Sequence, residues 1–177
     1  MIGSLRATLQ RLRDQLRERG QRPSVTLGGP VTADEIERAS ILLEYGALAE
    51  AMYLMMSADG NVTDDEKEVL KGALRALSSD TLRSVHLEAL MDAAVMHVTA
   101  QGREERLNEV IASLRDDPAR AEVAFVLAAA IAFADNAIAD EENETLNSLA
   151  EGLGIDENRA TTLLDGVEAD LRANATP

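Results

Sequence analysis

The feature that most constrains the fold of this chain is an internal repeat, in which residues 47–77 correspond to residues 123–153. The apolar stretch "ALAEAMYLMMSA" (residues 47–58) corresponds to "VAFVLAAAIAFA" (residues 123–134). The acid-rich stretch "EKEVLKGALRAL" (residues 66–77) corresponds to "ENETLNSLAEGL" (residues 142–153). A helix that is hydrophobic nearly all round belongs in a protein interior. We therefore expect two copies of one multi-helix unit, each with a central apolar helix that leads into an amphipathic one.

The composition favours helices. The 177 residues include no Trp, two Phe and two Tyr, whereas strands are enriched in aromatic and β-branched side chains. A hydrophobic content of 46% is enough for one core. Ala128–Ala130 and Ala132 leave room for the two central helices to approach each other closely. We predict an all-α protein, a compact bundle of about seven helices with an internal pseudo-twofold repeat, over residues 33–177.

Capping residues predict where several helices begin. Thr63 and Glu66 have the spacing of a capping box, in which each side chain accepts a backbone N–H of the first turn. Asp117 followed by Pro118 is a favoured pair for the cap and the first turn. The further expected caps are Thr32, Ser79 or Asp80, and Asp156.

Residues 1–22, here called the basic arm, differ from the rest of the chain in charge. They carry six Arg against Asp14 and Glu18, a net charge of +4. Because the whole chain has a formal net charge of −15, residues 23–177 carry −19. Apolar residues recur in the arm every three or four positions, which predicts an amphipathic helix. "PSVTLGGP" then interrupts the pattern, so residues 23–32 are predicted to form a linker. The apolar residues of the arm are Ile2, Leu5, Leu9, Leu12 and Leu16.

Three kinds of partner suit such an arm. It can dock on its own acidic domain, pair with a second copy in a homodimer, or contact an anionic membrane surface peripherally. The short apolar seam without an aromatic anchor favours docking or self-association. The amino terminus has no unbroken apolar core of a secretory signal, and the longest uncharged apolar run, residues 123–134, is shorter than a membrane span. We expect a cytoplasmic protein, with membrane association only through the arm.

Several functional classes have no support in the sequence. A net charge of −15 argues against nucleic acid, because that binding depends on Lys and Arg that neutralise phosphates. No Cys is present for thiol chemistry or Cys-based metal sites. His86 and His97 lie about 16 Å apart along a helix, too far to share an ion, and are expected to be ordinary, partly buried histidines. No nucleophile with a base and no phosphate-binding loop is evident, and a hydrolase with paired carboxylates would need a partner base that nothing indicates. We expect no enzyme.

The acidic strings at the two helix junctions carry a family resemblance. "SADGNVTDDE" (residues 57–66) and "FADNAIADEE" (residues 133–142) each follow an apolar segment and open an amphipathic one. They resemble the signature of TerB-like domains, which include the TerB tellurite-resistance proteins and the amino-terminal domain of the DjlA co-chaperone. The resemblance covers about residues 33–173. It implies a compact all-α domain of about seven helices and a link to tellurite resistance, general stress response and membrane-associated protein complexes, and it does not imply a catalytic activity.

The resemblance also implies a divalent-cation site. The family's Asp corresponds to Asp59 and Asp135, and its helix-opening Glu corresponds to Glu66 and Glu142. If the junctions meet at one end of the bundle, these four carboxylates would form one site, as bundles gather ligands from facing helices. Oxygen ligands without His or Cys suit Ca²⁺, Mg²⁺ or Mn²⁺. An EF-hand is excluded, because Asp64 stands where that loop requires Gly.

Two interpretations of these acids remain open from the residues. In the first, the acidic end binds a divalent cation or a basic protein partner. In the second, the acids are solvated helix starts, which the helix dipole favours by about 0.3–1 kcal/mol each. The chain would then be a structural or adaptor domain without a metal site, and the basic arm would recruit its partner or a membrane.

Overall fold

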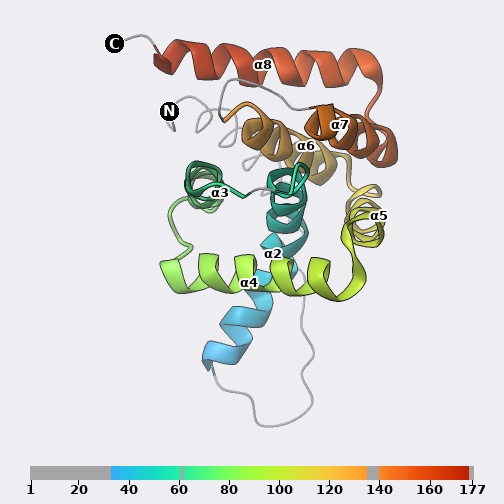
Figure 1. The fold of residues 1–177 in the computed structure, drawn as a ribbon. Helices are drawn as coiled ribbons and strands as arrows, with labels where there is room; N and C mark the ends of the chain where they lie inside the picture. The colour runs from blue at the N-terminus through green and yellow to red at the C-terminus, as the bar shows by residue number, and fades with distance from the viewer. Residues whose placement is uncertain (1–32, 61, 135–139, 176–177) are drawn as a thin grey trace.

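The computed structural model describes residues 33–60, 62–134 and 140–175, which form seven α-helices and no strand (Figure 1). This confirms the predicted all-α bundle. The basic arm, the linker and the predicted cap Thr32 lie outside the described residues. The helices are α2 (Ala33–Met56), α3 (Asp64–Leu77), α4 (Ser84–Gln101), α5 (Arg103–Leu114), α6 (Pro118–Ala132), α7 (Asp140–Leu153) and α8 (Glu157–Ala175).

The helix boundaries reproduce the internal repeat. Helix α3 begins at Asp64 and ends at Leu77, and α7 begins and ends at their repeat equivalents, Asp140 and Leu153. Helix α4 follows α3 and packs against α2, and α8 follows α7 and packs against α6. Each repeat therefore has three helices. Helix α5 joins the repeats and contacts α2, α4, α6 and α7.

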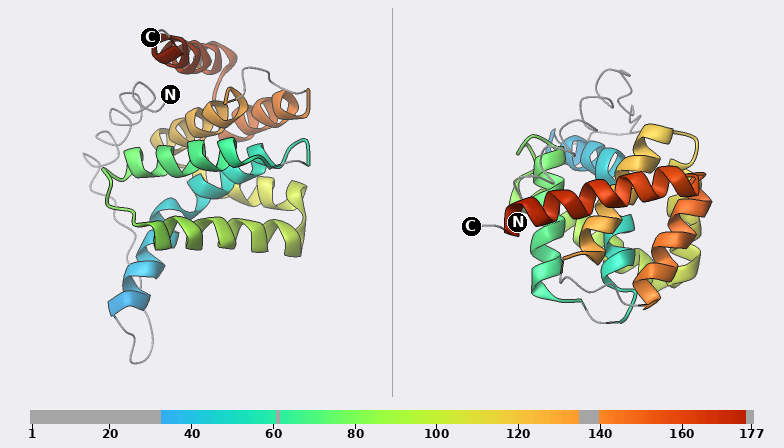
Figure 2. Two further views of the ribbon diagram at one scale, coloured as in Figure 1. Left: turned by 60° about the vertical axis from the view of Figure 1, so that its left-hand side comes forward. Right: turned by 90° about the horizontal axis from the view of Figure 1, so that it is seen from above.

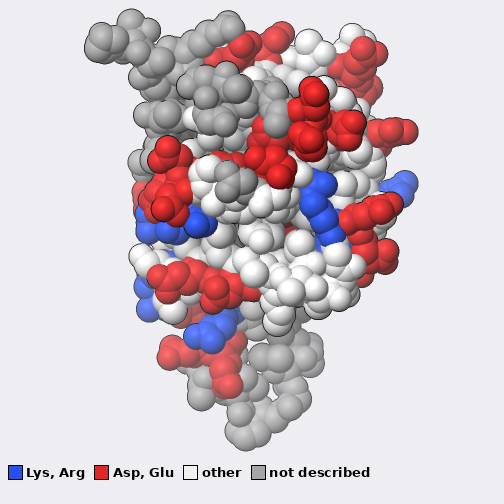
Figure 3. Space-filling view, in the orientation of Figure 1, with Lys and Arg blue, Asp and Glu red and all other residues white. Residues whose placement is uncertain are grey.

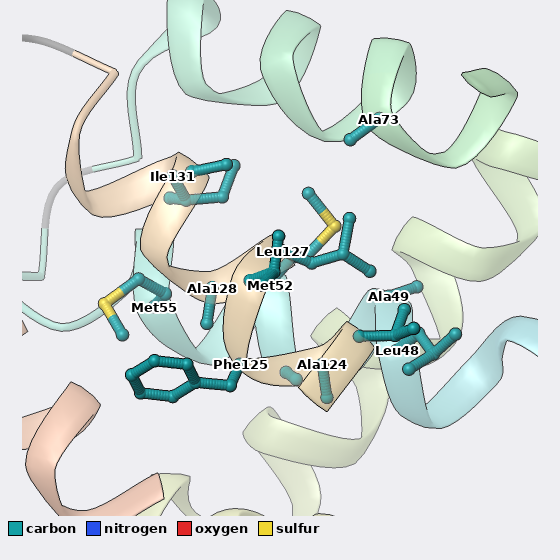
Figure 4. Close-up of a cluster of buried hydrophobic side chains, with 14 of the residues drawn as sticks. Leu48, Ala49, Met52, Met55, Ala73, Ala124, Phe125, Leu127, Ala128 and Ile131 are labelled. Atoms are coloured by element: carbon teal, nitrogen blue, oxygen red, sulfur yellow. The ribbon is translucent and has the colours of Figure 1, made fainter. Parts of the chain in front are cut away.

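The two apolar helices α2 and α6 pack against each other at the centre, as predicted (Figure 4). Every residue from Val123 to Ala132 of α6 is buried. Ala124 and Ala128 lie beside Leu48 and Met52 of α2, where small side chains let the two backbones approach (Figure 4). The two copies of the apolar stretch therefore form the centre of the core.

This packing brings the described helix ends beside the two junctions to one end of the bundle. Helix α2 ends, and α3, α5 and α7 begin, at the same end of the bundle in both views of Figure 2. We call this the acidic end, because the first turns of α3 and α7 each carry three acidic residues. Its described acids are Asp59, Asp64, Asp65, Glu66, Asp140, Glu141 and Glu142.

Helix α2 is partly exposed. By length and composition alone, Asp34–Met56 could cross a membrane, but 44% of its most apolar window is buried in the bundle. Its first half projects beyond α4 (Figures 1 and 2), and Ile36 and Leu43 are exposed there. Because core helices of soluble proteins have the same composition, this is weak evidence for membrane association.

Most of the predicted caps are present, and one prediction was wrong. Asp117 Oδ1 accepts the backbone N–H of Ala119 at 3.1 Å, and Asp156 Oδ1 accepts that of Arg159 at 3.0 Å. Ser79 and Asp80, however, do not cap α4, which begins at Ser84 after Arg83. They have φ values of 58° and 61°. Such left-handed residues end a helix, so they close α3 instead.

Two glycines within helices are expected to respond oppositely to alanine. A Cβ at Gly46 of α2 would meet nothing within 4 Å, so Gly46→Ala should stabilise the protein by about 0.5–1 kcal/mol through helix propensity. A Cβ at Gly152 of α7 would lie 2.6 Å from Ile111 Cδ1 and 2.8 Å from its Cγ2. Gly152→Ala should therefore destabilise it by about 1–3 kcal/mol. Urea unfolding measures both, and a Gly152→Ala protein as stable as Gly46→Ala would contradict this packing of α7 on α5.

Candidate functional site

The acidic end has both exposed and buried carboxylates. Asp and Glu side chains gather on the face in view in Figure 3, over the region where α2 ends and α7 begins in Figure 1. Asp59, Asp64, Asp65, Asp140 and Glu141 are exposed to solvent. The exposed carboxylates of the first turns interact favourably with the positive ends of the helix dipoles.

Glu66 is buried, and its local role is clear. Its Oε2 accepts hydrogen bonds from the backbone N–H and the hydroxyl of Thr63, both at 2.7 Å, while Thr63 Oγ1 accepts the N–H of Glu66 at 3.2 Å. This confirms the predicted capping box. Both bonds to the carboxylate end on Oε2.

The other predicted ligands occupy different environments. Glu142 is the repeat equivalent of Glu66, and each is 9% exposed. Asp59 is exposed just beyond the end of α2. Asp135 lies outside the described residues. Within the part of the chain that the structure describes, no group of three or more Asp, Glu or His side chains has the geometry of a metal site.

Two lysines of α3 pair with neighbouring acids. Lys67 Nζ lies 2.9 Å from Asp64 Oδ1, and Lys71 Nζ lies 2.8 Å from Glu68 Oε1. The hydrogen bond from Lys67, aided by its charge, lowers the pKa of Asp64, and Lys71 lowers the pKa of Glu68 in the same way. These acids are therefore ionised at neutral pH.

Arg103, the first residue of α5, connects the two repeats at the acidic end. Its Nε and Nη2 donate to the carbonyl oxygen of Leu54 in α2 at 3.2 and 3.0 Å. Nη2 also donates to Thr145 Oγ1 in α7 at 2.5 Å. Burial lowers the pKa of the Arg103 guanidinium, which nevertheless stays protonated at any physiological pH. No local pattern in the sequence indicated this residue.

A buried ion pair lies deeper in the bundle. Glu50 of α2 accepts two hydrogen bonds from Arg106 of α5, to Oε1 at 2.6 Å and to Oε2 at 2.8 Å. The Glu50 side chain is 5% exposed and that of Arg106 is 12% exposed. The bonds to Glu50 raise the pKa of Arg106 although burial opposes the shift. One feature of the sequence could have indicated this buried pair: Glu50 is the single charged residue in the apolar run of residues 47–58.

The two histidines lie in separate clusters, as the spacing predicted. His97 Nδ1 lies 3.1 Å from Glu50 Oε2 and so joins the buried ion pair. His86 is buried at the start of α4, where its Nδ1 accepts the backbone N–H of Arg83 at 3.2 Å. The Arg83 side chain in turn pairs with Glu37 of α2 at 2.9 Å. Both clusters fasten α4 to α2. His97 is partly buried, as predicted, and it also contacts a buried carboxylate.

Comparison with known proteins gives one match. A family model described as "Tellurite resistance protein TerB" matches residues 46–163, two thirds of the chain. The matched part begins within α2 and ends within α8, so it includes both helix junctions of the acidic end. No curated protein and no solved structure matches the chain.

Proposed function

Because the chain belongs to the TerB family, we propose that it is a non-catalytic binding module of a tellurite-resistance or general stress-response system. In this proposal the acidic end binds a divalent cation or a basic segment of a protein partner. The carrying observation is that the repeat places the acidic first turns of α3 and α7 at one end of the bundle (Figure 2).

The chemistry of the acidic end supports this choice. Carboxylates gathered at one end of a fold repel one another, and a cation or a basic partner would offset their charge. All the candidate ligands are oxygens, which suit Ca²⁺, Mg²⁺ or Mn²⁺ better than softer metals. The ligands proposed are Asp59 and Glu66 from the first repeat and Asp135 and Glu142 from the second.

Calorimetric titration with Ca²⁺, Mg²⁺, Mn²⁺ and Zn²⁺ tests the cation. We expect binding of at least one of the first three, and a loss of at least about tenfold in affinity in both Asp59→Ala and Asp135→Ala, because each removes a charged ligand. Asp116→Ala is the matched control, since Asp116 is exposed in the turn between α5 and α6, away from the acidic end. If no ion gives heat, the proposed cation site is wrong. If Asp116→Ala loses as much affinity as the other two variants, the assigned ligands are wrong.

The same calorimeter separates the basic partner from the cation. A lysine-rich peptide replaces the ions, and binding that weakens in Asp59→Ala but not in Asp116→Ala would support a protein partner. If neither the ions nor the peptide bind, the second candidate function remains, which is a structural or adaptor domain. The capping box of Thr63 and Glu66 favours that candidate, because it accounts for a buried Glu at this position without any ligand.

A further inference from the structure

The first half of α2, residues 33–47, has one apolar side that the described helices leave uncovered. We call it the projecting half of α2, because it extends beyond α4 (Figures 1 and 2). None of residues 34–47 is buried. Ile41, Leu42 and Tyr45 pack against the core on one side, but Ile36 and Leu43 are 47% and 48% exposed. A helical segment that buries so little gains little stability from tertiary packing.

The uncovered side has the spacing of a helix-packing surface. Ile36, Ala39 and Leu43 follow one another at intervals of three and four residues, so they lie along one line of the helix. Glu50 continues this line one heptad after Leu43, and there α5 covers α2 through the two hydrogen bonds from Arg106. The same line of α2 is therefore packed in its second half and exposed in its first.

The charges around this line are mostly negative. The projecting half of α2 has four acids and one base, a formal charge of −3. Asp and Glu side chains are visible over it in Figure 3. Arg83 of α4 pairs with one of these acids, Glu37, and so offsets only one charge. An apolar line among acids suits a basic amphipathic helix and disfavours an anionic membrane. The acids are Asp34, Glu35, Glu37 and Glu44, and the base is Arg38.

The basic arm of the same chain has the complementary pattern. Leu9, Leu12 and Leu16 have the same intervals of three and four residues. Arg6 and Arg13 each follow directly after an apolar residue of the arm, so in the predicted helix they flank its apolar side. The arm and the projecting half of α2 therefore match in apolar spacing and are opposite in charge.

The linker is long enough to let the arm fold back. Residues 23–32 join the arm to the start of α2. Ten residues span up to about 33–36 Å when extended, whereas helix–helix connections in bundles need only about 2–8 residues. An antiparallel arrangement on α2 therefore needs no strained connection.

From this match we propose that the basic arm docks in its own chain on the projecting half of α2, as an antiparallel helix. Leu9 then lies opposite Leu43, Leu16 lies opposite Ile36, and Leu12 packs over the small side chain of Ala39. The docked arm covers the exposed apolar line and offsets the charge of its acids. This proposal does not rest on the proposed function of the acidic end.

A disulfide between introduced cysteines tests the docking in the full chain, which has no Cys of its own. Leu12→Cys/Ala39→Cys is expected to form an intramolecular disulfide at least about tenfold faster than Leu12→Cys/Ser148→Cys, because docking raises the effective concentration of the two thiols. Ser148 is the control because it is exposed in α7. Equal rates for the two pairs would overturn the proposal.

Non-reducing electrophoresis of the same samples identifies which molecule the arm binds. A monomeric product that lacks the mass of two hydrogens supports docking within one chain. Disulfide-linked dimers as the main product of Leu12→Cys/Ala39→Cys would place the arm on a second copy and would overturn the proposal.

Hydrogen exchange measures the effect of the arm on α2. Leu12→Asp puts a charge on the apolar side of the arm, and Ala7→Asp puts the same charge on the opposite side of the predicted helix. The amides of residues 37–47 are expected to exchange at least about threefold faster in Leu12→Asp than in Ala7→Asp. Both substitutions lie outside the described helices, so the bundle is expected to fold in both variants. Equal exchange in the two variants would contradict the docking.

Vesicle flotation tests a membrane as the alternative occupant of the arm. The parent protein and Leu12→Asp are expected to float equally little with vesicles of phosphatidylcholine and phosphatidylglycerol, because the docked arm buries its apolar side. Flotation of the parent that Leu12→Asp abolishes would show that the arm binds the membrane instead, and the proposal would be wrong.

Discussion

The Glu50→Leu variant is expected to lose about 3–5 kcal/mol of unfolding free energy, because Arg106 loses its buried partner and keeps only the more exposed Glu109 as an acidic partner. Arg106 makes both of its short bonds from α5 to α2 through this carboxylate. His97 of α4 contacts the same oxygen, Oε2, that accepts from Arg106 Nη2. One carboxylate thus holds three helices at one corner. Urea unfolding monitored by circular dichroism measures the loss.

A double-mutant cycle separates the cost of an unpaired buried charge from the net contribution of the Glu50–Arg106 pair to stability. The Glu50→Leu/Arg106→Leu protein should be much closer in stability to the parent than Glu50→Leu alone, since replacing both charges by apolar groups is often neutral. Arg159→Leu is the control, because Arg159 pairs with Glu122 at 2.6 Å in a more exposed position. Its loss should be within about 1 kcal/mol. A Glu50→Leu loss no greater than that of the control would contradict the buried ion pair.

The Phe125→Ala variant is expected to lose about 3–5 kcal/mol, the second large effect. Phe125 is 1% exposed in α6, and its ring lies beside Met55 of α2 (Figure 4). Truncation leaves a cavity beside the contact between the two central helices, which the neighbouring helices can refill only in part. Thermal and urea unfolding both report the loss.

A second phenylalanine of the chain provides the matched control. Phe133, at the carboxyl-terminal cap of α6, is only partly buried, so Phe133→Ala should cost clearly less than Phe125→Ala. Phe125→Leu, which keeps most of the volume, should cost about 1.5 kcal/mol or less. Equal losses for the two alanine variants would mean that the α2–α6 contact is not the centre of the core.

Local chemistry made much of the fold predictable. The correspondence of residues 47–77 with residues 123–153 predicted two related units, and the described helices α3 and α7 begin and end at equivalent positions of the repeat. The capping box of Thr63 and Glu66 was predictable because its partners are close neighbours in the sequence. Ser79 and Asp80 misled the prediction, because such residues both begin helices and adopt left-handed conformations that end them.

The candidate site was only partly predictable. The acids of the helix starts stand out in the sequence, and the structure brings the described ones to one end of the bundle. Arg103, which bridges α2 and α7 at that end, did not stand out, because it resembles any other arginine at the start of a helix. Its partners Leu54 and Thr145 are 49 and 42 residues away. Glu50 and Arg106 are likewise 56 residues apart.

The sequence by itself determined the helices, the internal repeat and the acidic character of the two junctions. Each of these depends on residues a few positions apart, where periodicity, capping and helix dipoles act. Only the tertiary structure decided which buried charges meet, that Arg103 bridges α2 and α7, and that Glu66 is already bonded to Thr63 through one oxygen. Contacts between distant segments depend on how whole helices pack. The partner of a buried charge can therefore be identified only from the packed structure.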